Sequence, residues 1–282
     1  MLQNLYKTTM IFPHDRVTKR ERETKAATMT KVVILCGGMG TRLREETEYK
    51  PKPLVEIGGK PILWHIMKHY AQYDFKDFIL CLGYKGEMIK NYFLNYKTQS
   101  SDFTIALKTG NLTIHNTEEE DWNITCVDTG EDSLTGKRLK GIKAFVGDED
   151  FMVTYGDGVS DVNIKELLAL HTAKGKIGTI TGIHPISKYG SLKINEENII
   201  HEFVEKPILN DRINGGFFVF TKEIFEHLND DMFEFSTLPK LAKEKKLAMY
   251  KHDGFWQCMD TYRDYAHLNK LWKEEKPWKT WK

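Results

Sequence analysis

The chain has 282 residues, of which 40% are hydrophobic and 29% charged, a composition typical of a globular protein with a sizeable buried core. Its formal net charge is +1, so there is no general positive field to attract nucleic acid. The longest apolar runs reach about five residues, far short of a membrane-spanning helix. We therefore expect a globular protein that binds neither nucleic acid nor membrane.

The first 29 residues differ in composition from the rest of the chain. The first 29 residues are rich in charged side chains and poor in apolar ones, so we expect residues 1–29 to be a disordered extension, or translation to start at Met29. Residues 30–282 are expected to form a single domain. The four cysteines lie far apart and are expected to be buried free thiols in a reducing, cytoplasmic compartment: Cys36, Cys81, Cys126 and Cys258.

Strand and helix patterns alternate along the rest of the chain. They predict, in order, strand 31–35, helix 61–73, strand 78–82, helix 87–96, a hairpin turning at 108–111, strand 124–127, helix 136–145 and strand 151–155. They continue with helix 164–173 capped by Asn163, strand 177–183, a hairpin of 191–194 with 199–204, strand 217–220, helices 222–228 and 235–245, edge strand 247–252 and helix 262–273. This alternation predicts an α/β fold with a doubly wound, mostly parallel sheet and an antiparallel addition from the later hairpins.

The loop after the first predicted strand is suited to binding an anion. Three glycines within four positions (Gly37, Gly38 and Gly40) let the backbone approach a ligand closely and present several N–H groups to it. Arg42 and Lys52 add two cations. Because ligands of open α/β sheets bind beyond the carboxyl ends of the strands, we predict that this loop holds a polyphosphate.

Two well-known glycine motifs do not fit this chain. A dinucleotide-binding G-x-G-x-x-G starting at Gly38 would need a glycine where Leu43 stands. The nearest approach to a Walker motif, from Gly130 to Gly136-Lys137, has the wrong spacing and is followed by Arg138 rather than serine or threonine. The loop therefore belongs to neither class.

The histidines show no metal-binding motif. His65 and His69 are four residues apart on a predicted helix, which is a spacing that can bind metal. Trp64 and Met67 lie around them in the sequence, so we interpret both histidines as packing or surface residues.

The glycine loop, with Lys50-Pro51-Lys52-Pro53 after it, resembles the signature of the sugar nucleotidyltransferases, and the resemblance continues over residues 30–282. Tyr155-Gly156-Asp157-Gly158 and Met259-Asp260-Thr261 resemble the family's two metal-binding segments, Glu205-Lys206-Pro207 its sugar-phosphate lysine segment, and Asn214-Gly215-Gly216 a sugar-binding turn. Residues 61–67, 128–130 and 254–257 are similar to the branch that uses CTP and glucose 1-phosphate. One departure is Cys36, where the family usually has alanine.

The resemblance implies a Rossmann-like nucleotidyltransferase fold and a role for each matching residue. Mg²⁺, which prefers oxygen ligands, would be held by Asp157 and Asp260, although a lone aspartate after a strand more often caps a turn. The catalytic cations would be Arg42 on the β- and γ-phosphates, Lys52 on the α-phosphate and Lys206 on the sugar phosphate. Further nucleotide contacts are expected from Gly37, Gly38, Gly40, Thr41, Asp128, Thr129 and Gly130. Further substrate contacts, on the side of the antiparallel addition, are expected from Tyr155, Gly190, Glu205, Asn214 and Gly215.

The resemblance also implies an activity. It is the Mg²⁺-dependent transfer of a cytidylyl group from CTP to glucose 1-phosphate, giving CDP-glucose and pyrophosphate. The enzyme would be a cytoplasmic homo-oligomer that supplies activated sugar for bacterial cell-surface polysaccharide such as O-antigen. One alternative keeps the reaction but uses UTP or dTTP, because a few side chains can invert a choice between pyrimidines. Another is a non-catalytic nucleotide-sensing or regulatory subunit, against which the presence of both aspartates argues. Asp128-Thr129-Gly130 also fits a simple turn.

Overall fold

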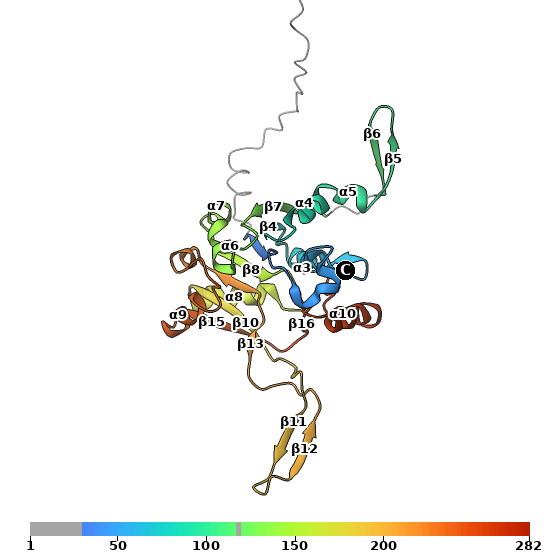
Figure 1. Ribbon diagram of the computed structural model, residues 1–282. Helices are drawn as coiled ribbons and strands as arrows, with labels where there is room; N and C mark the ends of the chain where they lie inside the picture. Colours follow the sequence, from blue (N-terminus) through green and yellow to red (C-terminus); the bar gives the residue numbers. More distant parts are fainter. Residues whose placement is uncertain (1–29, 117–119) are drawn as a thin grey trace, which may run out of the picture.

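The computed structural model describes residues 30–116 and 120–282, and the prediction for residues 1–29 lies outside this part of the chain. An eight-stranded sheet occupies its centre in the order β13-β10-β14-β8-β1-β4-β7, with β15 beside β10 (Figure 1). Its strands are β1 (Val32–Leu35), β4 (Asp77–Leu82), β7 (Asn123–Asp128), β8 (Phe151–Tyr155), β10 (Gly178–Ile183), β13 (Ile213–Asn214), β14 (Phe218–Phe220) and β15 (Leu247–His252).

The sheet is mostly parallel. Strands β8, β1, β4 and β7 run in one direction, and β15 runs parallel to β10 at the edge, as predicted. Strand β14 is antiparallel to both β8 and β10. The prediction of a doubly wound α/β fold is therefore confirmed, with β14 and β13 as its antiparallel members.

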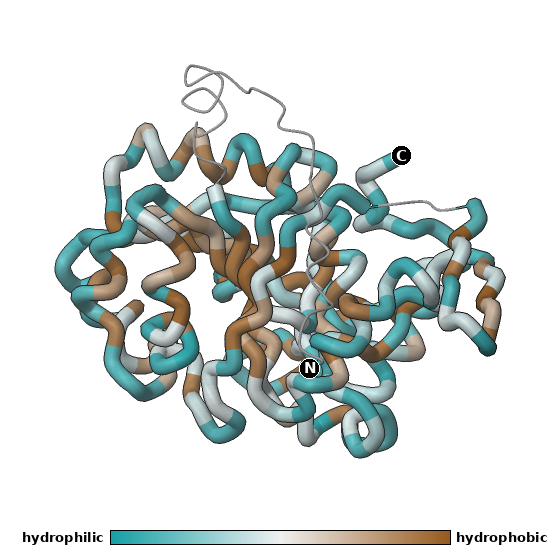
Figure 2. Tube along the Cα trace, turned by 90° about the horizontal axis from the view of Figure 1, so that it is seen from above, coloured by the Kyte–Doolittle hydropathy of each residue, from teal (hydrophilic) through white to brown (hydrophobic). Residues whose placement is uncertain are grey.

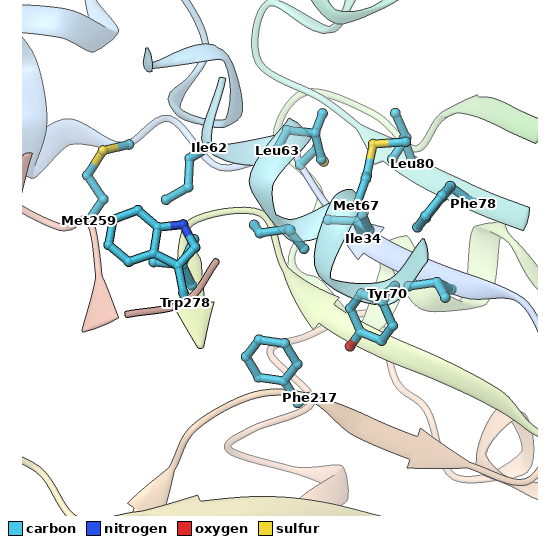
Figure 3. Close-up of a cluster of buried hydrophobic side chains, with 14 of the residues drawn as sticks. Ile34, Ile62, Leu63, Met67, Tyr70, Phe78, Leu80, Phe217, Met259 and Trp278 are labelled. Atoms are coloured by element: carbon cyan, nitrogen blue, oxygen red, sulfur yellow. The ribbon is translucent and has the colours of Figure 1, made fainter. Parts of the chain in front are cut away.

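Both faces of the sheet are covered, as the tube coloured by hydropathy illustrates (Figure 2). On β1, Val32 and Ile34 belong to one buried cluster while Val33 and Leu35 belong to the other, because successive strand side chains point to opposite faces. Part of the first cluster is drawn in Figure 3, which labels Ile62, Met67 and Tyr70 of α3 (Ile62–Ala71). The whole cluster also includes side chains of α4 (Gly86–Leu94), α8 (Ile164–Lys174) and α10 (Tyr262–Glu274). The second includes α6 (Thr135–Gly141), α7 (Lys143–Val146), the 3₁₀ helix η3 (Lys222–Glu226) and α9 (Thr237–Lys243).

Some helices differ from their predicted limits. The helix predicted at 136–145 is divided into α6 and α7 at Ile142, because Gly141 lowers helix stability at this point. The segment 222–228 forms only a 3₁₀ turn, and the helix predicted from 235 begins at Thr237. The predicted cap of α8 is confirmed, since the Asn163 side chain accepts from Glu166 N at 3.2 Å. Within the described residues, no helix is both long enough and apolar enough to cross a membrane.

Several short elements were not predicted. They are η1 (Thr41–Leu43), α2 (Arg44–Thr47), η2 (Lys52–Leu54), β2 (Glu56–Ile57), β3 (Lys60–Pro61), β9 (Gly158–Ser160), α5 (Tyr96–Gln99) and β16 (Trp256–Cys258). Each of them has two to four residues, too few for a periodic pattern. The pairing of β9 with β16 joins distant parts of the chain and matters for the active site.

Two hairpins project from the body (Figure 1). One consists of β5 (Asp102–Ala106) and β6 (Asn111–His115), and the other of β11 (Ser191–Ile194) and β12 (Ile200–Val204). Both were predicted. We call residues 185–209, which contain the second hairpin, the arm. Large apolar side chains are more than half exposed on the arm, among them Leu192, Ile194, Ile199, Ile200 and Phe203.

Candidate active site

A pocket of about 440 Å³ opens at the carboxyl ends of β1 and β8. The chain continues from β1 to β4 on one side, whereas β8 lies on the other side of β1. This is a topological switch point, where open α/β sheets bind their ligands. Nine of the predicted site residues line the pocket: Gly37, Gly38, Gly40, Thr41, Arg42, Lys52, Tyr155, Asp157 and Asp260.

Arg138, on α6, joins the loops around this pocket. Its guanidinium donates to the carbonyls of Leu82 and Gly130 and to Thr129 Oγ1 through one nitrogen, and to the carbonyls of Gly37 and Glu131 through the other, all at 2.8–3.0 Å. The side chain is only 4% exposed. Arg138 thus links the segments that follow β1, β4 and β7. Sequence reasoning missed it, because a single arginine in a helix carries no local signal.

Two glycines of the loop are required by the local geometry. A Cβ on Gly37 would lie 2.1 Å from the Arg138 guanidinium, a distance that real Cβ atoms do not reach. Gly40 has φ +63°, in the left-handed region that favours glycine. The loop therefore depends on glycine for close packing at one position and for backbone conformation at the other.

The pairing of β9 with β16 brings Asp157 and Asp260 together. Strand β9 follows Asp157 directly, and Cys258 on β16 lies opposite Gly158. One residue further along, Met259 N donates to Asp157 O at 2.8 Å. Asp157 directly precedes β9 and Asp260 follows β16 after Met259, so both side chains reach the same pocket.

Asp260 is also held by the start of α10. The Thr261 side chain caps the helix by accepting from Asp264 N, and Asp264 Oδ2 accepts in turn from Thr261 N at 2.8 Å. The same oxygen accepts from Asp260 N at 3.1 Å. This capping box restrains the backbone on which the Asp260 carboxylate is mounted.

Lys52 connects the two carboxylates. Its Nζ lies 2.7 Å from Asp157 Oδ2 and 2.7 Å from Asp260 Oδ1. Burial disfavours the charged form of Lys52, but the two ion pairs outweigh it, so the pKa of Lys52 is raised. For Asp260, burial opposes ionisation, yet Lys52 and then Arg42, whose guanidinium is 3.2 Å away, lower its pKa overall. Lys52 and Asp260 are therefore both charged at neutral pH.

The donor set suits a hard divalent cation. Asp157 Oδ2 and Asp260 Oδ1 converge on one cationic atom, the Lys52 ammonium, so the same two oxygens can face a metal ion. Mg²⁺ commonly takes one or two carboxylates together with phosphate oxygens and waters. The residues present thus fit Mg²⁺ bound with a phosphate ligand.

A hydrogen-bond chain joins Asn214, which is outside the pocket lining, to Tyr155 and Glu234, which belong to it. Asn214 Nδ2 donates to Tyr155 Oη at 3.3 Å, and Tyr155 Oη donates to Glu234 Oε1 at 2.7 Å. Thr135 Oγ1 donates to the other Glu234 oxygen at 2.6 Å. Burial and the neighbouring carboxylate raise the pKa of Tyr155, so its hydroxyl stays protonated. Glu234 was not predicted, because its segment shows no motif.

The remaining predicted residues lie outside the pocket lining. Thr129 and Gly130 contact Arg138, and the Asp128 side chain accepts from Gly130 N in a turn of the simple kind considered above. Gly215 O accepts from Trp256 Nε1 at 2.8 Å. Gly190, Glu205 and Lys206 lie on the arm, and none of them lines the pocket of their own chain.

The histidines and cysteines of this region pack rather than react. His65 and His69 are buried, and His65 accepts from Trp278 Nε1 through Nδ1 while its Nε2 contacts Ile57 O at 2.8 Å.

Cys36 lines the pocket but is only 1% exposed, and burial raises the pKa of its thiol well above the usual range. All four cysteines are free, but only Cys36 and Cys81 are fully buried. A protonated thiol is a poor nucleophile, so Cys36 serves as a small packing residue.

Comparisons with known proteins show which family the chain belongs to. The nucleotidyl transferase family model matches residues 31–275. The glucose-1-phosphate cytidylyltransferases of Salmonella typhi and Salmonella typhimurium are each 48% identical over 256 residues, which cover 89% of this chain and 99% of theirs. The crystal structure of HddC from Yersinia pseudotuberculosis shares the fold, with a TM-score of 0.64 and 24% identity over 86% of this chain and 99% of that one. On the breadth of these matches, the chain belongs to the nucleotidyl transferase family.

Proposed function

We propose that this protein transfers a cytidylyl group from CTP to glucose 1-phosphate, releasing pyrophosphate and forming CDP-glucose. The observation that carries the proposal is the convergence of a three-glycine loop, two cations and two carboxylates in one pocket. The choice of CTP and glucose 1-phosphate is supported by 48% identity to enzymes of that name over nearly their whole length.

The reaction needs positioning more than proton transfer. A phosphate oxygen of glucose 1-phosphate attacks the α-phosphorus of CTP, and the bond from that phosphorus to the β-phosphate oxygen breaks as pyrophosphate leaves. The second pKa of a phosphate monoester is about 6, so the nucleophile is mostly a dianion at pH 7 and needs no general base. The site has to hold two anions in line and neutralise their charge.

The proposed roles follow from this requirement. Backbone N–H groups of the glycine loop and Arg42 bind the β- and γ-phosphates, and Lys52 neutralises charge at the α-phosphate. Asp157 and Asp260 hold Mg²⁺, which when bound supplies further positive charge to the phosphates. Tyr155 and Asn214, braced by Glu234, face the sugar.

We also propose that the protein works as a homo-oligomer whose arm completes the site of a second copy. Lys206 is the expected partner of the sugar phosphate, yet it lies on the arm, outside the pocket of its own chain. The exposed apolar side chains of the arm, among them Phe203 at 63% exposure, favour a protein partner. A second copy packed against the arm would bury these apolar side chains and would place Lys206 at the pocket of that copy.

Product analysis tests the proposed reaction. Phosphorus NMR of the full chain incubated with CTP, glucose 1-phosphate and Mg²⁺ should show the paired signals of CDP-glucose together with pyrophosphate. Asp157→Asn should remove both products, and Asp253→Asn, at an exposed position directly after β15 and outside the pocket lining, should not. Product formation by Asp157→Asn at the wild-type rate would refute the site.

A further inference from the structure

Lys52 lies between the two carboxylates of the candidate active site. Its Nζ is 2.7 Å from an oxygen of each, and its side chain is only 11% exposed. A lysine ammonium has three donors, so two of them serve Asp157 and Asp260. The ammonium is the cation around which these carboxylates are arranged.

A divalent metal needs the same oxygens. Mg²⁺ binds carboxylate oxygens at about 2.0–2.1 Å with near-octahedral geometry. An ion bound to both Asp157 Oδ2 and Asp260 Oδ1 at this distance would lie in, or directly beside, the space that the Lys52 ammonium fills. An ion placed beside the ammonium would leave two cations in contact, so Lys52 and the metal exclude each other from this pair of oxygens.

We infer that Lys52 competes with the divalent metal for Asp157 and Asp260, so that the protein alone binds the metal weakly and the metal enters together with an anionic phosphate ligand. The phosphate gives the ammonium another partner and so frees the carboxylates. We take this phosphate ligand to be a nucleoside triphosphate, and that identification rests on the proposed function.

The stem of Lys52 is placed for such an exchange. A Cβ on Gly40 would lie 3.2 Å from Lys52 Cβ and 3.4 Å from its Cδ, so the stem runs beside the glycine loop. Lys52 opens the turn η2, where Pro51 and Pro53 restrict the backbone. Side-chain torsions alone therefore have to change for Nζ to move from the carboxylates to a phosphate on the loop.

Arg42 is a much weaker competitor. Within the described residues its ion pair is with Asp260 alone, at 3.2 Å, and its side chain is 68% exposed. Exposed ion pairs contribute little, because water and salt screen them. Lys52 is therefore the residue that competes with the metal for the two carboxylates.

Metal binding in the absence of substrates tests the inference. Mn²⁺ is titrated into the full chain and into Lys52→Met and Lys50→Met, and free Mn²⁺ is measured by electron paramagnetic resonance. Lys52→Met should bind Mn²⁺ at least about 10-fold more tightly than the wild type, which corresponds to about 1.4 kcal/mol. Lys50→Met should match the wild type, because Lys50 forms its ion pairs with Glu46 and Glu56 and not with the two aspartates. Equal Mn²⁺ affinity of the wild type and Lys52→Met would overturn the inference.

A second readout covers the case in which Lys52→Met is unstable. Wild-type protein alone should show only weak Mn²⁺ binding, and tight binding by it would also overturn the inference. If Lys52→Met folds, Mn²⁺ should raise its Tm more than it raises the Tm of the wild type. The double variant Lys52→Met/Asp157→Asn should lose this additional rise in Tm. No nucleotide or sugar is present, so an error in the proposed substrates leaves these results unchanged.

Discussion

Lys52 Nζ and Asp260 Oδ1 lie 2.7 Å apart although 208 positions separate the two residues in the chain. The contact forms because η2 places Lys52 at the pocket and the β9–β16 pair returns the chain to it just before Asp260. The charge arrangement of the site is thus a product of the whole fold.

Substitution of Lys52 should remove activity, whereas the lysine two positions earlier should be dispensable. Lys52→Ala deletes the cation proposed for the α-phosphate, and we expect kcat/KM to fall by about 100-fold or more. Lys50→Ala removes only two long ion pairs, with Glu46 and Glu56, at 3.9 and 3.8 Å. Steady-state pyrophosphate release checks both, with circular dichroism to confirm folding. Comparable losses in the two variants would contradict the assignment.

Two neighbouring glycines should differ in their effect on stability. An alanine Cβ at Gly37 meets the Arg138 guanidinium at 2.1 Å, whereas one at Gly38 has no atom within 4 Å. We expect Gly37→Ala to lower the free energy of unfolding by about 1–3 kcal/mol, as overpacking does. Gly38→Ala should change it by less than about 0.5 kcal/mol. Urea unfolding of both variants measures the difference, and similar stabilities would show that Arg138 yields easily.

The buried His65 should make stability depend on pH. Burial lowers the pKa of His65 to about 4, and its Nδ1 faces the Trp278 N–H donor, where an added proton cannot be accommodated. The unfolded chain, with a histidine pKa near 6.5, therefore binds a proton that the folded protein refuses. Stability from this group is fully present above about pH 6.5 and is lost as the pH falls toward 4, by about 3 kcal/mol.

Urea unfolding between pH 7 and pH 4.5 measures this loss. His65→Gln should show a shallower decline of the free energy of unfolding than the wild type. His267→Gln, at an exposed position on α10, should keep the wild-type slope. Identical slopes in all three proteins would mean that His65 does not govern the effect.

Mixing two inactive variants should restore activity if the arm serves a second copy. Lys206→Ala leaves the pocket intact, and Asp157→Asn leaves the arm intact. In co-expressed mixtures, an intact pocket of the first variant can meet an intact arm of the second, and turnover should reappear. The matched control combines Asp157→Asn with Lys52→Ala, which damages every pocket and should stay inactive. If the mixture of Lys206→Ala and Asp157→Asn is as inactive as the control mixture, the result would argue against sites shared between copies.

The sequence predicted most of the fold and much of the pocket. Buried runs such as Val32–Leu35 and Phe151–Tyr155 are recognisable because apolar runs between turn residues are typical of central parallel strands. The residues at their carboxyl ends, including Gly37 and Asp157, were placed correctly at the pocket by the same argument.

The features that were missed depend on tertiary contacts. Strands β9 and β16 have three residues each and exist only because they pair with one another. Arg138 acts through carbonyls on three separate loops, and Glu234 through hydroxyls of Tyr155 and Thr135. Neither has a neighbour in sequence that would reveal its role. The position of Lys206 on a projecting arm likewise depends on how the chain, and any second copy, is arranged in space.

The most direct test of the account is pyrophosphate release by the purified protein with glucose 1-phosphate and Mg²⁺, measured in separate reactions with CTP, UTP, dTTP and ATP. We predict rapid release with CTP and little with the other three. Preferred release with UTP or dTTP would contradict the assignment of the base, and silence with all four nucleotides would contradict the proposed reaction itself.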